Sequence, residues 1–229
     1  MSGLKEVDIA FQAAGNKVTP DEIDFIQTVS FINPTTSATW VGTAAGGTST
    51  QARALVLINT LLDTPRNLLY SAVGTNDMGG TWSVNGFNQF GDPITETVGN
   101  GTVAAGTPAF NVAGTKIFAK VTSGTFTVAT GAVGAGSARI GVAVGTAGTL
   151  AFKLGLPTKI AGTSDVRSIT WSKENVTTTL NGGTIGAFVD ATNHAITGSA
   201  IMGGTEVYTV RFKSTFDNSS KPNLSKLYQ

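Results

Sequence analysis

The feature that most constrains what this chain folds into is an alternation of apolar and polar residues with a period of two. In the segment 22–32, Val29 and Phe31 fall on one side of the chain, and Asp24 and Ser30 fall on the other. Because successive side chains of a β-strand point to opposite faces of a sheet, this pattern predicts a half-buried strand. The same alternation recurs at 6–11, 52–58, 67–73, 81–87, 93–98, 116–130, 138–144, 149–154, 166–172, 184–190 and 206–216.

Residues that favour turns separate these predicted strands at short intervals. They include "GTNDMGG" at 74–80, "GFNQFGDP" at 86–93 and "LNGG" at 180–183. Gly, Asn, Asp and Pro provide the backbone angles that tight turns require. Short strands with regular turns predict an all-β fold, an antiparallel β-sandwich or jelly roll with long loops and extended terminal arms.

We divide the predicted fold into three parts. Residues 1–62 form an N-terminal arm with strands, residues 63–155 form the central β-sandwich core, and residues 156–229 form C-terminal strands with a basic tail. The last part either completes the central domain or forms a second one. The Gly- and Thr-rich stretch 99–115 has little apolar surface, which predicts a long exposed loop or a segment that a neighbour orders. At 48–63, a helix is an alternative to a strand.

The composition excludes several classes of partner and site. Only 13% of the 229 residues are charged, against roughly 25% in an average soluble domain, and the net charge is +1. Such a chain has no overall field that would attract nucleic acid or an acidic membrane, so we expect no direct contact with either. The chain has no cysteine, which excludes disulfides and thiolate metal sites.

Two features of the sequence bear on where the chain is made. Glu6 and Asp8 interrupt the N-terminal segment in which a signal peptide needs an apolar core. No stretch reaches the roughly 18 apolar residues of a membrane-spanning helix. We therefore expect a soluble product that is made in a cytoplasm.

Residues that could carry catalysis or bind a cofactor do not form a recognised constellation. His194 is the only histidine, and its neighbours in "DATNHAITG" place it in a loop, whereas a zinc site uses two or three imidazoles. The run "GAVGAGSARIG" has Arg139 where a dinucleotide loop needs its third glycine. The acidic cluster "PDEIDF" at 20–25 lacks the spacing and closing glutamate of a calcium loop, so a weak Ca²⁺ site there is only an alternative. We expect no catalytic residue, no cofactor and no metal, and a protein that is not an enzyme.

The central part of the chain carries an ordered set of short motifs. "PRN" at 65–67 opens a predicted strand, and after a glycine turn come "WSV" at 82–84, "FGDP" at 90–93 and "ITETV" at 94–98. After a Gly/Thr loop follow "GTKIFAKVTSGTFTV" at 114–128 and "IGVAVGTAG" at 140–148. Over roughly residues 63–148, this layout resembles tailed-bacteriophage virion proteins, which occur as head decoration (cement) proteins or other minor virion components.

The resemblance implies an all-β module used for assembly, with no catalytic residues. We therefore expect a non-enzymatic virion structural protein, a capsid decoration protein that binds the major capsid protein and stabilises the shell. Closed symmetry allows such a protein to act as a homotrimer. Its place would be the capsid surface of the virion, after assembly in the host cytoplasm. A tail or neck protein, such as a tail-tube subunit, is the first alternative.

The residues expected to contact neighbouring subunits are basic or aromatic. The basic ones gather toward the C-terminus and form either a solvated tail or an arm that docks on an acidic neighbour; they are Arg211, Lys213, Lys221 and Lys226. Trp40 is the aromatic candidate, since Trp often anchors an interface, with burial in the core as the alternative.

A carbohydrate-binding module is a further alternative, from a different class of protein. The rings of Trp82, Phe87 and Phe90 and the amides of Asn85 and Gln89 lie in one predicted hairpin. Such groups stack on sugar rings and form hydrogen bonds to them. Because Trp82 belongs to an apolar alternation, however, its ring is predicted to face the core.

Overall fold

The computed structural model describes residues 25–32, 37–45, 52–74, 80–100, 110–128, 136–142, 152–173, 176–180, 188–198 and 207–214. Across these ranges the chain consists of β-strands in antiparallel pairs, connecting turns and a short 3₁₀ turn, η2 (Thr163–Asp165), and they contain no α-helix. The prediction of an all-β fold of packed antiparallel sheets is therefore confirmed.

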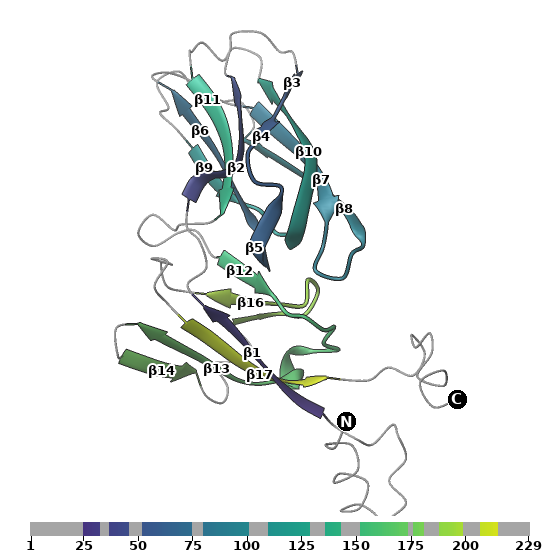
Figure 1. Cartoon of the computed structure of the whole chain (residues 1–229), viewed down its shortest axis with the longest axis vertical. Helices are drawn as coiled ribbons and strands as arrows, with labels where there is room; N and C mark the ends of the chain where they lie inside the picture. Colours follow the sequence, from purple (N-terminus) through teal and green to yellow (C-terminus); the bar gives the residue numbers. More distant parts are fainter. Residues whose placement is uncertain are drawn as a thin grey trace, which may run out of the picture.

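The described strands form three sheets (Figure 1). The five-stranded sheet has the order β4 (Val56–Leu57), β2 (Ser37–Ala45), β11 (Gly136–Val142), β6 (Leu68–Gly74) and β9 (Phe110–Ala113). The eight-stranded sheet has the order β15 (Val189–Asp190), β16 (Ala195–Gly198), β12 (Phe152–Gly155), β5 (Leu61–Arg66), β10 (Phe118–Val128), β7 (Gly80–Phe87) and β8 (Pro93–Asn100), with β3 (Ala52–Ala54) also paired to β10. The four-stranded sheet has the order β1 (Phe25–Ile32), β17 (Val207–Ser214), β13 (Val166–Lys173) and β14 (Val176–Leu180).

The first hydrophobic core lies between the five-stranded sheet and the β10, β7 and β8 part of the eight-stranded sheet. Along β7, buried residues alternate with exposed or half-buried ones, as the sequence pattern predicts. Trp82 of β7 is fully buried, and its ring centroid lies 4.6 Å from that of Phe126 and 5.9 Å from that of Tyr70. Because Tyr70 belongs to the opposite sheet, these three rings hold the two layers together.

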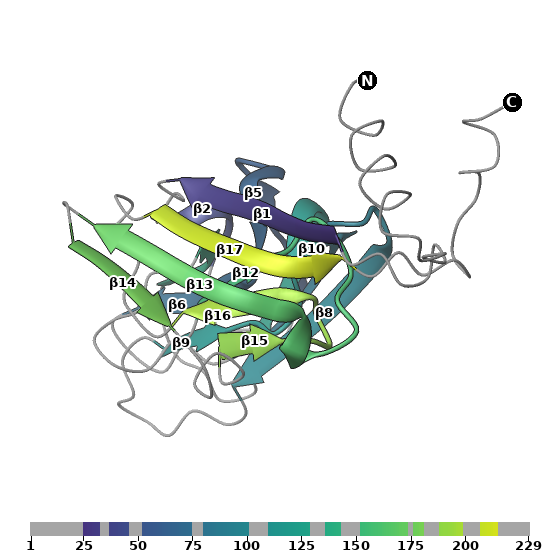
Figure 2. The same cartoon turned by 90° about the horizontal axis from the view of Figure 1, so that it is seen from below.

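The second hydrophobic core lies between the four-stranded sheet and the β12 and β16 part of the eight-stranded sheet (Figure 2). The ring of Phe152 in β12 meets that of Tyr208 in β17 edge to face, with the centroids 5.3 Å apart. Val210 and Phe212 of β17 are fully buried, and Arg211 between them is exposed. One continuous sheet therefore contributes to both cores, at its two ends.

Strand pairing does not follow the predicted boundary at residue 62. β1 pairs with β17 along its whole length, so the second core uses strands from both ends of the described chain. β2 pairs instead with β11 in the central part of the sequence. Sheet membership thus assigns β1 and β2, both from the N-terminal part, to two different cores.

Three local predictions need correction. The helix alternative at 48–63 is wrong for its described part, because 52–63 forms β3, β4 and the start of β5. The loop predicted over 99–115 contains β9, which the main chain of β6 orders by pairing with it. "PRN" does not open a strand, since Pro65 and Arg66 end β5 and Asn67 separates β5 from β6.

The hairpin predicted around "NQFGDP" is confirmed. β7 and β8 pair from Gly80 with Asn100 to Phe87 with Pro93. In the turn, Asn88 Oδ1 accepts hydrogen bonds of 2.9 Å from the main-chain N–H groups of Phe90 and Asp92. This is the side-chain-to-backbone bonding for which Asn is favoured in turns. β6 and β7 belong to different sheets, so these two strands do not pair as a hairpin.

Candidate functional site

Large apolar side chains are exposed on one short stretch, which we call the apolar segment (residues 56–61). Val56, Ile58 and Leu61 are 69%, 60% and 69% exposed. Phe87, at 38%, is the other large apolar side chain that is exposed among the described residues. Three such aliphatic residues within six positions form a local surface of the kind that proteins use to bind one another.

The apolar segment follows from a run, "ALVLI" at 54–58, that is apolar at every position. A strand with only one covered face needs apolar residues at every second position. Here Leu55 is buried and Leu57 is partly buried against the first core, so Val56 and Ile58 point to the other side. Folding of this segment therefore requires apolar residues only on its inward face, and the apolar residues on its outward face are not explained by packing within the described residues.

Main-chain hydrogen bonds fix the apolar segment to both sheets of the first core. The N–H of Leu55 donates to Gly124 O of β10 at 2.8 Å, and the N–H of Ile58 donates to Val41 O of β2 at 2.8 Å. Leu61, the first residue of β5, then pairs with Lys120 of β10. Because the backbone is held at these points, the outward side chains are presented on a rigid support.

Leu61 also belongs to a row of exposed side chains that runs across the eight-stranded sheet. Lys120 of β10 pairs with Leu61 on one side and with Phe87 of β7 on the other. Residues aligned in this way share a face of the sheet. The exposed apolar surface therefore continues from Leu61 past the lysine stem to Phe87.

Trp40, a predicted contact residue, lies beside the apolar segment. It is half-buried in β2 and packs against the first core. Its main-chain carbonyl accepts a hydrogen bond of 2.9 Å from Asn59 Nδ2. Its Nε1 is buried and has no hydrogen-bond partner within the described ranges.

The predicted basic contact residues lie elsewhere. Arg211 is exposed in β17, where it pairs with Thr28 of β1 and Ser168 of β13. The main chain of Lys213 pairs with that of Ile26, while Lys221 and Lys226 lie outside the described residues. Since β17 and β2 belong to different sheets, the structure does not join Arg211 and Trp40 into one surface.

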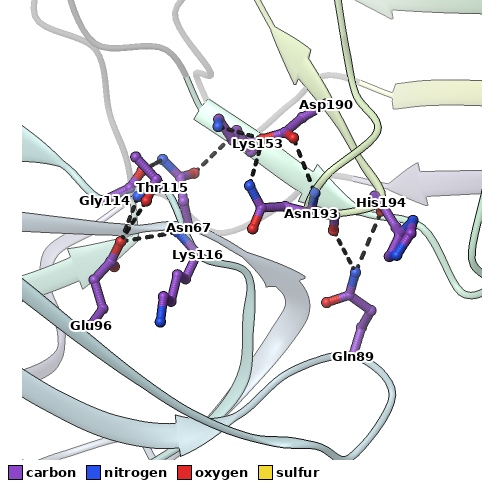
Figure 3. Close-up of polar contacts among 10 residues, drawn as sticks. All are labelled: Asn67, Gln89, Glu96, Gly114, Thr115, Lys116, Lys153, Asp190, Asn193 and His194. Atoms are coloured by element: carbon purple, nitrogen blue, oxygen red, sulfur yellow. Dashed lines mark hydrogen bonds and ion pairs between the residues drawn. The ribbon is translucent and has the colours of Figure 1, made fainter. Parts of the chain in front are cut away.

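A group of buried polar contacts connects the two cores, and we call it the polar joint (Figure 3). Asn67 is fully buried between β5 and β6. Its Nδ2 donates to Gly114 O at 2.9 Å, and its Oδ1 accepts from the N–H of Lys153 in β12 at 2.7 Å. Arg66 beside it is 1% exposed and pairs with Asp63 at 2.9 Å. Burial lowers the pKa of Arg66, and the carboxylate of Asp63 opposes this effect.

The polar joint continues through β12 to the turn between β15 and β16. Lys153 Nζ forms an ion pair with Asp190 Oδ2, and Asn193 donates to both carboxylate oxygens of Asp190. Burial raises the pKa of Asp190, but the hydrogen bonds from Lys153 and Asn193 outweigh it and hold that pKa below its ordinary value of 3.8. Gln89 Nε2 donates to the carbonyls of Asn193 at 2.9 Å and His194 at 3.4 Å, which ties the β7–β8 hairpin to this turn.

Glu96 of β8 makes a second buried polar contact between sheets, and it is 4% exposed. Its Oε1 accepts from the N–H groups of Thr115 and Lys116 at 2.6 and 3.0 Å, and its Oε2 accepts from the hydroxyl of Tyr70 at 2.9 Å. Burial raises the pKa of Tyr70 well above its ordinary value, and the charge of Glu96 adds to this effect. The motif residues Arg66, Asn67 and Glu96 thus serve the architecture of the fold.

A pocket of about 230 Å³ lies where the β7–β8 hairpin meets the β15–β16 turn. Polar side chains from four separate segments line it, among them Asn88, Asp92, Lys116, Lys159, Asn193 and His194. Phe90 contributes a ring to the lining, with Lys159 Nζ 5.4 Å from its centroid. No local pattern in the sequence brings these residues together.

His194 lies in the turn before β16, as predicted. It is the one non-glycine residue with positive φ, 50°, in the described ranges. Its Nδ1 accepts a hydrogen bond of 3.3 Å from the N–H of Ile160, so the neutral ring carries its proton on Nε2. Partial burial lowers the pKa of His194 below its ordinary value of 6.5, and the charge of Lys159 lowers it further.

The residues of the sugar-binding alternative do not form one surface. Trp82 is fully buried among other rings, so it has no face for a sugar. Asn85 is exposed and donates to Ser123 while accepting from Thr95. Only Phe90 and Gln89 belong to the pocket.

The described residues contain no group of three or more histidine, aspartate or glutamate side chains placed to hold a metal ion. No helix in the described ranges is long and apolar enough to cross a membrane. The acidic cluster at 20–24 lies outside these ranges. No known protein family and no curated protein matches the chain.

Proposed function

We propose that this chain is a non-enzymatic structural protein of a tailed-phage virion, a capsid decoration protein that binds the major capsid protein and stabilises the shell. The observation that carries the proposal is the apolar segment, which presents Val56, Ile58 and Leu61 at 60–69% exposure on a backbone tied to two sheets. Full burial of one such side chain is worth about 1.5–3 kcal/mol. A partner that covers the segment therefore gains a compact apolar anchor.

The surroundings of the apolar segment also suit a protein interface. Protein interfaces combine a small apolar centre with a polar rim, and Trp is enriched among the residues that anchor them. Trp40 lies on the neighbouring strand, and Lys120 separates Leu61 from Phe87. The resemblance of residues 63–148 to virion proteins points to the kind of partner, a shell of repeated subunits. We place the protein on the capsid surface, as a homotrimer assembled in the host cytoplasm.

The experiment compares capsid shells with and without this chain. Shells that lack it should break at a lower temperature, and purified protein added back should restore their stability. The double substitution Ile58→Ser/Leu61→Ser should weaken binding to shells by about tenfold or more, because two apolar anchors are lost. The matched control, Thr97→Ser/Thr122→Ser, changes two exposed threonines and should bind normally.

Shells that lack the chain and are equally stable would contradict the decoration role. If shells bind both double variants equally, the apolar segment is not the contact. In that case the surface around Arg211 of β17 is tested next, with the substitution Arg211→Gln.

A tail or neck protein is the second candidate. The observation that favours it is β10, an 11-residue strand that pairs with β3, β5 and β7 and is the longest described strand. Long paired strands are the elements from which ring-forming tube subunits are built. The mass of the purified protein in solution separates the candidates, because a trimer supports decoration and a ring-forming hexamer supports the tail. A tag on the C-terminus, located on the virion by electron microscopy, tests the same choice directly.

A further inference from the structure

The pocket at the hairpin–turn junction combines positive charge with a rigid wall. Lys116 and Lys159 contribute two ammonium groups to its lining, and Asp92 contributes one carboxylate. Asp92 is already held by Asn88 Nδ2 at 3.2 Å, and Lys116 Nζ donates to Thr95 O. The lining therefore has an excess of one positive charge.

Lys159 is the cation of this lining whose ammonium has no acceptor within the described residues. Its Nζ lies over the ring of Phe90, and the rings of Phe90 and His194 meet in a T-shaped arrangement with the centroids 5.5 Å apart. Lys153, by contrast, is neutralised by Asp190. Phe90 thus contacts both the ammonium of Lys159 and the imidazole of His194, and all three residues line the pocket.

His194 offers a second donor to the pocket. Because Nδ1 accepts from Ile160, the neutral imidazole presents its N–H at Nε2. The strained backbone of His194, with φ 50°, is maintained by neighbouring contacts, including the bond from Gln89 to its carbonyl. Strain of this kind persists where the surrounding structure holds a side chain in one position.

We propose that this pocket is a binding site for a carboxylate, with Lys159 Nζ as the charged donor and His194 Nε2–H as the second donor. A single ammonium and a neutral N–H match the one negative charge of a carboxylate. A phosphate dianion would need more donors, and with two charges it would be repelled more strongly than a carboxylate by Asp92 in the lining. The carboxylate comes either from an acidic side chain of a protein partner or from a small carboxylic acid. This site does not rest on the proposed function.

His194 itself reports on the site, because a chain with one histidine gives one set of imidazole signals in NMR. Propionate, added at constant ionic strength with chloride as the balancing anion, should shift these signals in a saturable way. It should also raise the pKa of His194, because a nearby negative charge favours the imidazolium. Burial, the hydrogen bond with the Ile160 main chain and the charges of Lys159 and Asp190 already act on this pKa, and all of them stay in place in the titration of the wild-type protein.

Two variants and one control separate the site from a general effect of ions. Lys159→Gln should weaken propionate binding by about tenfold or more, since a charged hydrogen bond is lost. Asp92→Asn should strengthen binding, because it removes the repelling carboxylate. Lys120→Gln removes an exposed lysine that does not line the pocket and should leave binding unchanged.

Two further probes identify whether the ligand comes from a protein or a small acid, and whether it is a carboxylate or a phosphate. A capped tetraglutamate peptide that binds more tightly than propionate would assign the site to a protein partner, and equal or weaker binding would assign it to a small acid. Inorganic phosphate that shifts the His194 signals while both carboxylates do not would overturn the proposal. It would also be overturned if no probe gave a saturable shift, or if Lys159→Gln and Lys120→Gln behaved alike.

Discussion

The polar joint and the apolar segment lie close together in the sequence. Both depart from the usual arrangement of a soluble protein, in which apolar side chains are buried and polar side chains are exposed. Asn67 and Arg66 are polar and almost completely buried, whereas Ile58 and Leu61 are apolar and exposed. A buried polar group is tolerated only when its hydrogen bonds are made, and Asn67 makes them to two separate segments. An exposed aliphatic group has no such requirement, and the side chains of Ile58 and Leu61 are largely uncovered within the described fold. The first region therefore concerns stability, and the second concerns association.

The substitution Asn67→Ala should give the largest loss of stability. It leaves the carbonyl of Gly114 and the N–H of Lys153 without their partner, and we expect the free energy of unfolding to fall by about 3 kcal/mol. Urea denaturation measures the change. The matched control is Asn85→Ala, at an exposed asparagine, which should cost about 0.5 kcal/mol or less. If the two substitutions lowered the free energy of unfolding equally, Asn67 would contribute no more to stability than an exposed asparagine.

Substitution of Glu96 should have the next largest effect. Glu96→Ala leaves the buried hydroxyl of Tyr70 without its acceptor and frees the N–H groups of Thr115 and Lys116, at a cost of about 2 kcal/mol. Glu96→Gln should cost less than half as much. Its Oε1 still accepts from the turn, and its amide can donate to the hydroxyl oxygen of Tyr70. A larger loss for Gln than for Ala would contradict the role of this contact in joining the sheets.

Acidification should weaken the fold in two separate ranges of pH. The pKa of His194 is lower in the folded chain than its ordinary value of 6.5, so its contribution is complete above that value and is lost as the pH falls below it. The pKa of Asp190 is also lowered, from 3.8, so its contribution is lost only as the pH falls through the still lower folded value. Urea denaturation from pH 7.5 to pH 5 should therefore show a small fall in stability.

The variant His194→Gln identifies the source of that fall. Its stability should be nearly constant between about pH 7 and pH 5, since His194 is the only histidine in the sequence and histidine is the side chain whose ordinary pKa lies in this range. Asp190, whose pKa is held below 3.8, keeps its charge throughout this range. An unchanged slope in the variant would assign the pH dependence to another group.

Ile58→Ser and Leu61→Ser should have the smallest effect on stability, within about 0.5 kcal/mol of zero, because both side chains are already exposed. The same urea experiment measures this, beside the weakened shell binding described above. A loss as large as that of Asn67→Ala would show that another part of the same chain covers these residues. The conclusion that the apolar segment concerns association and not stability would then be wrong.

Local patterns in the sequence predicted the strands whose two faces differ. β7 and β10 have clear alternation, and their buried residues are the ones that the period of two selects. The turn between β7 and β8 was predictable because Asn88 forms its hydrogen bonds within four residues. β2 was missed, since "SATWVGTAA" is rich in small residues and has a weak apolar pattern. β9 and β14 were missed for a different reason, because each is ordered by pairing with the edge of a neighbouring strand.

The candidate sites were less predictable than the strands. The apolar segment had a signal, a run without polar positions, which marks a strand with apolar residues on both faces. The pocket had none, because Phe90, Lys159 and His194 come from three distant parts of the chain. The choice of Trp40 as a contact residue stays a prediction, and its place beside Asn59 depends on the pairing of β2 with β4.

The sequence by itself therefore determined that this chain forms antiparallel sheets, because alternation and turn chemistry act over a few residues. Tertiary structure decided that one sheet is shared by two cores, that β1 pairs with β17, and that Asn67 joins β12 to the turn at Gly114. The physical reason is that burial and hydrogen bonding are properties of the surroundings. Residues that are far apart along the chain supply those surroundings only after it has folded.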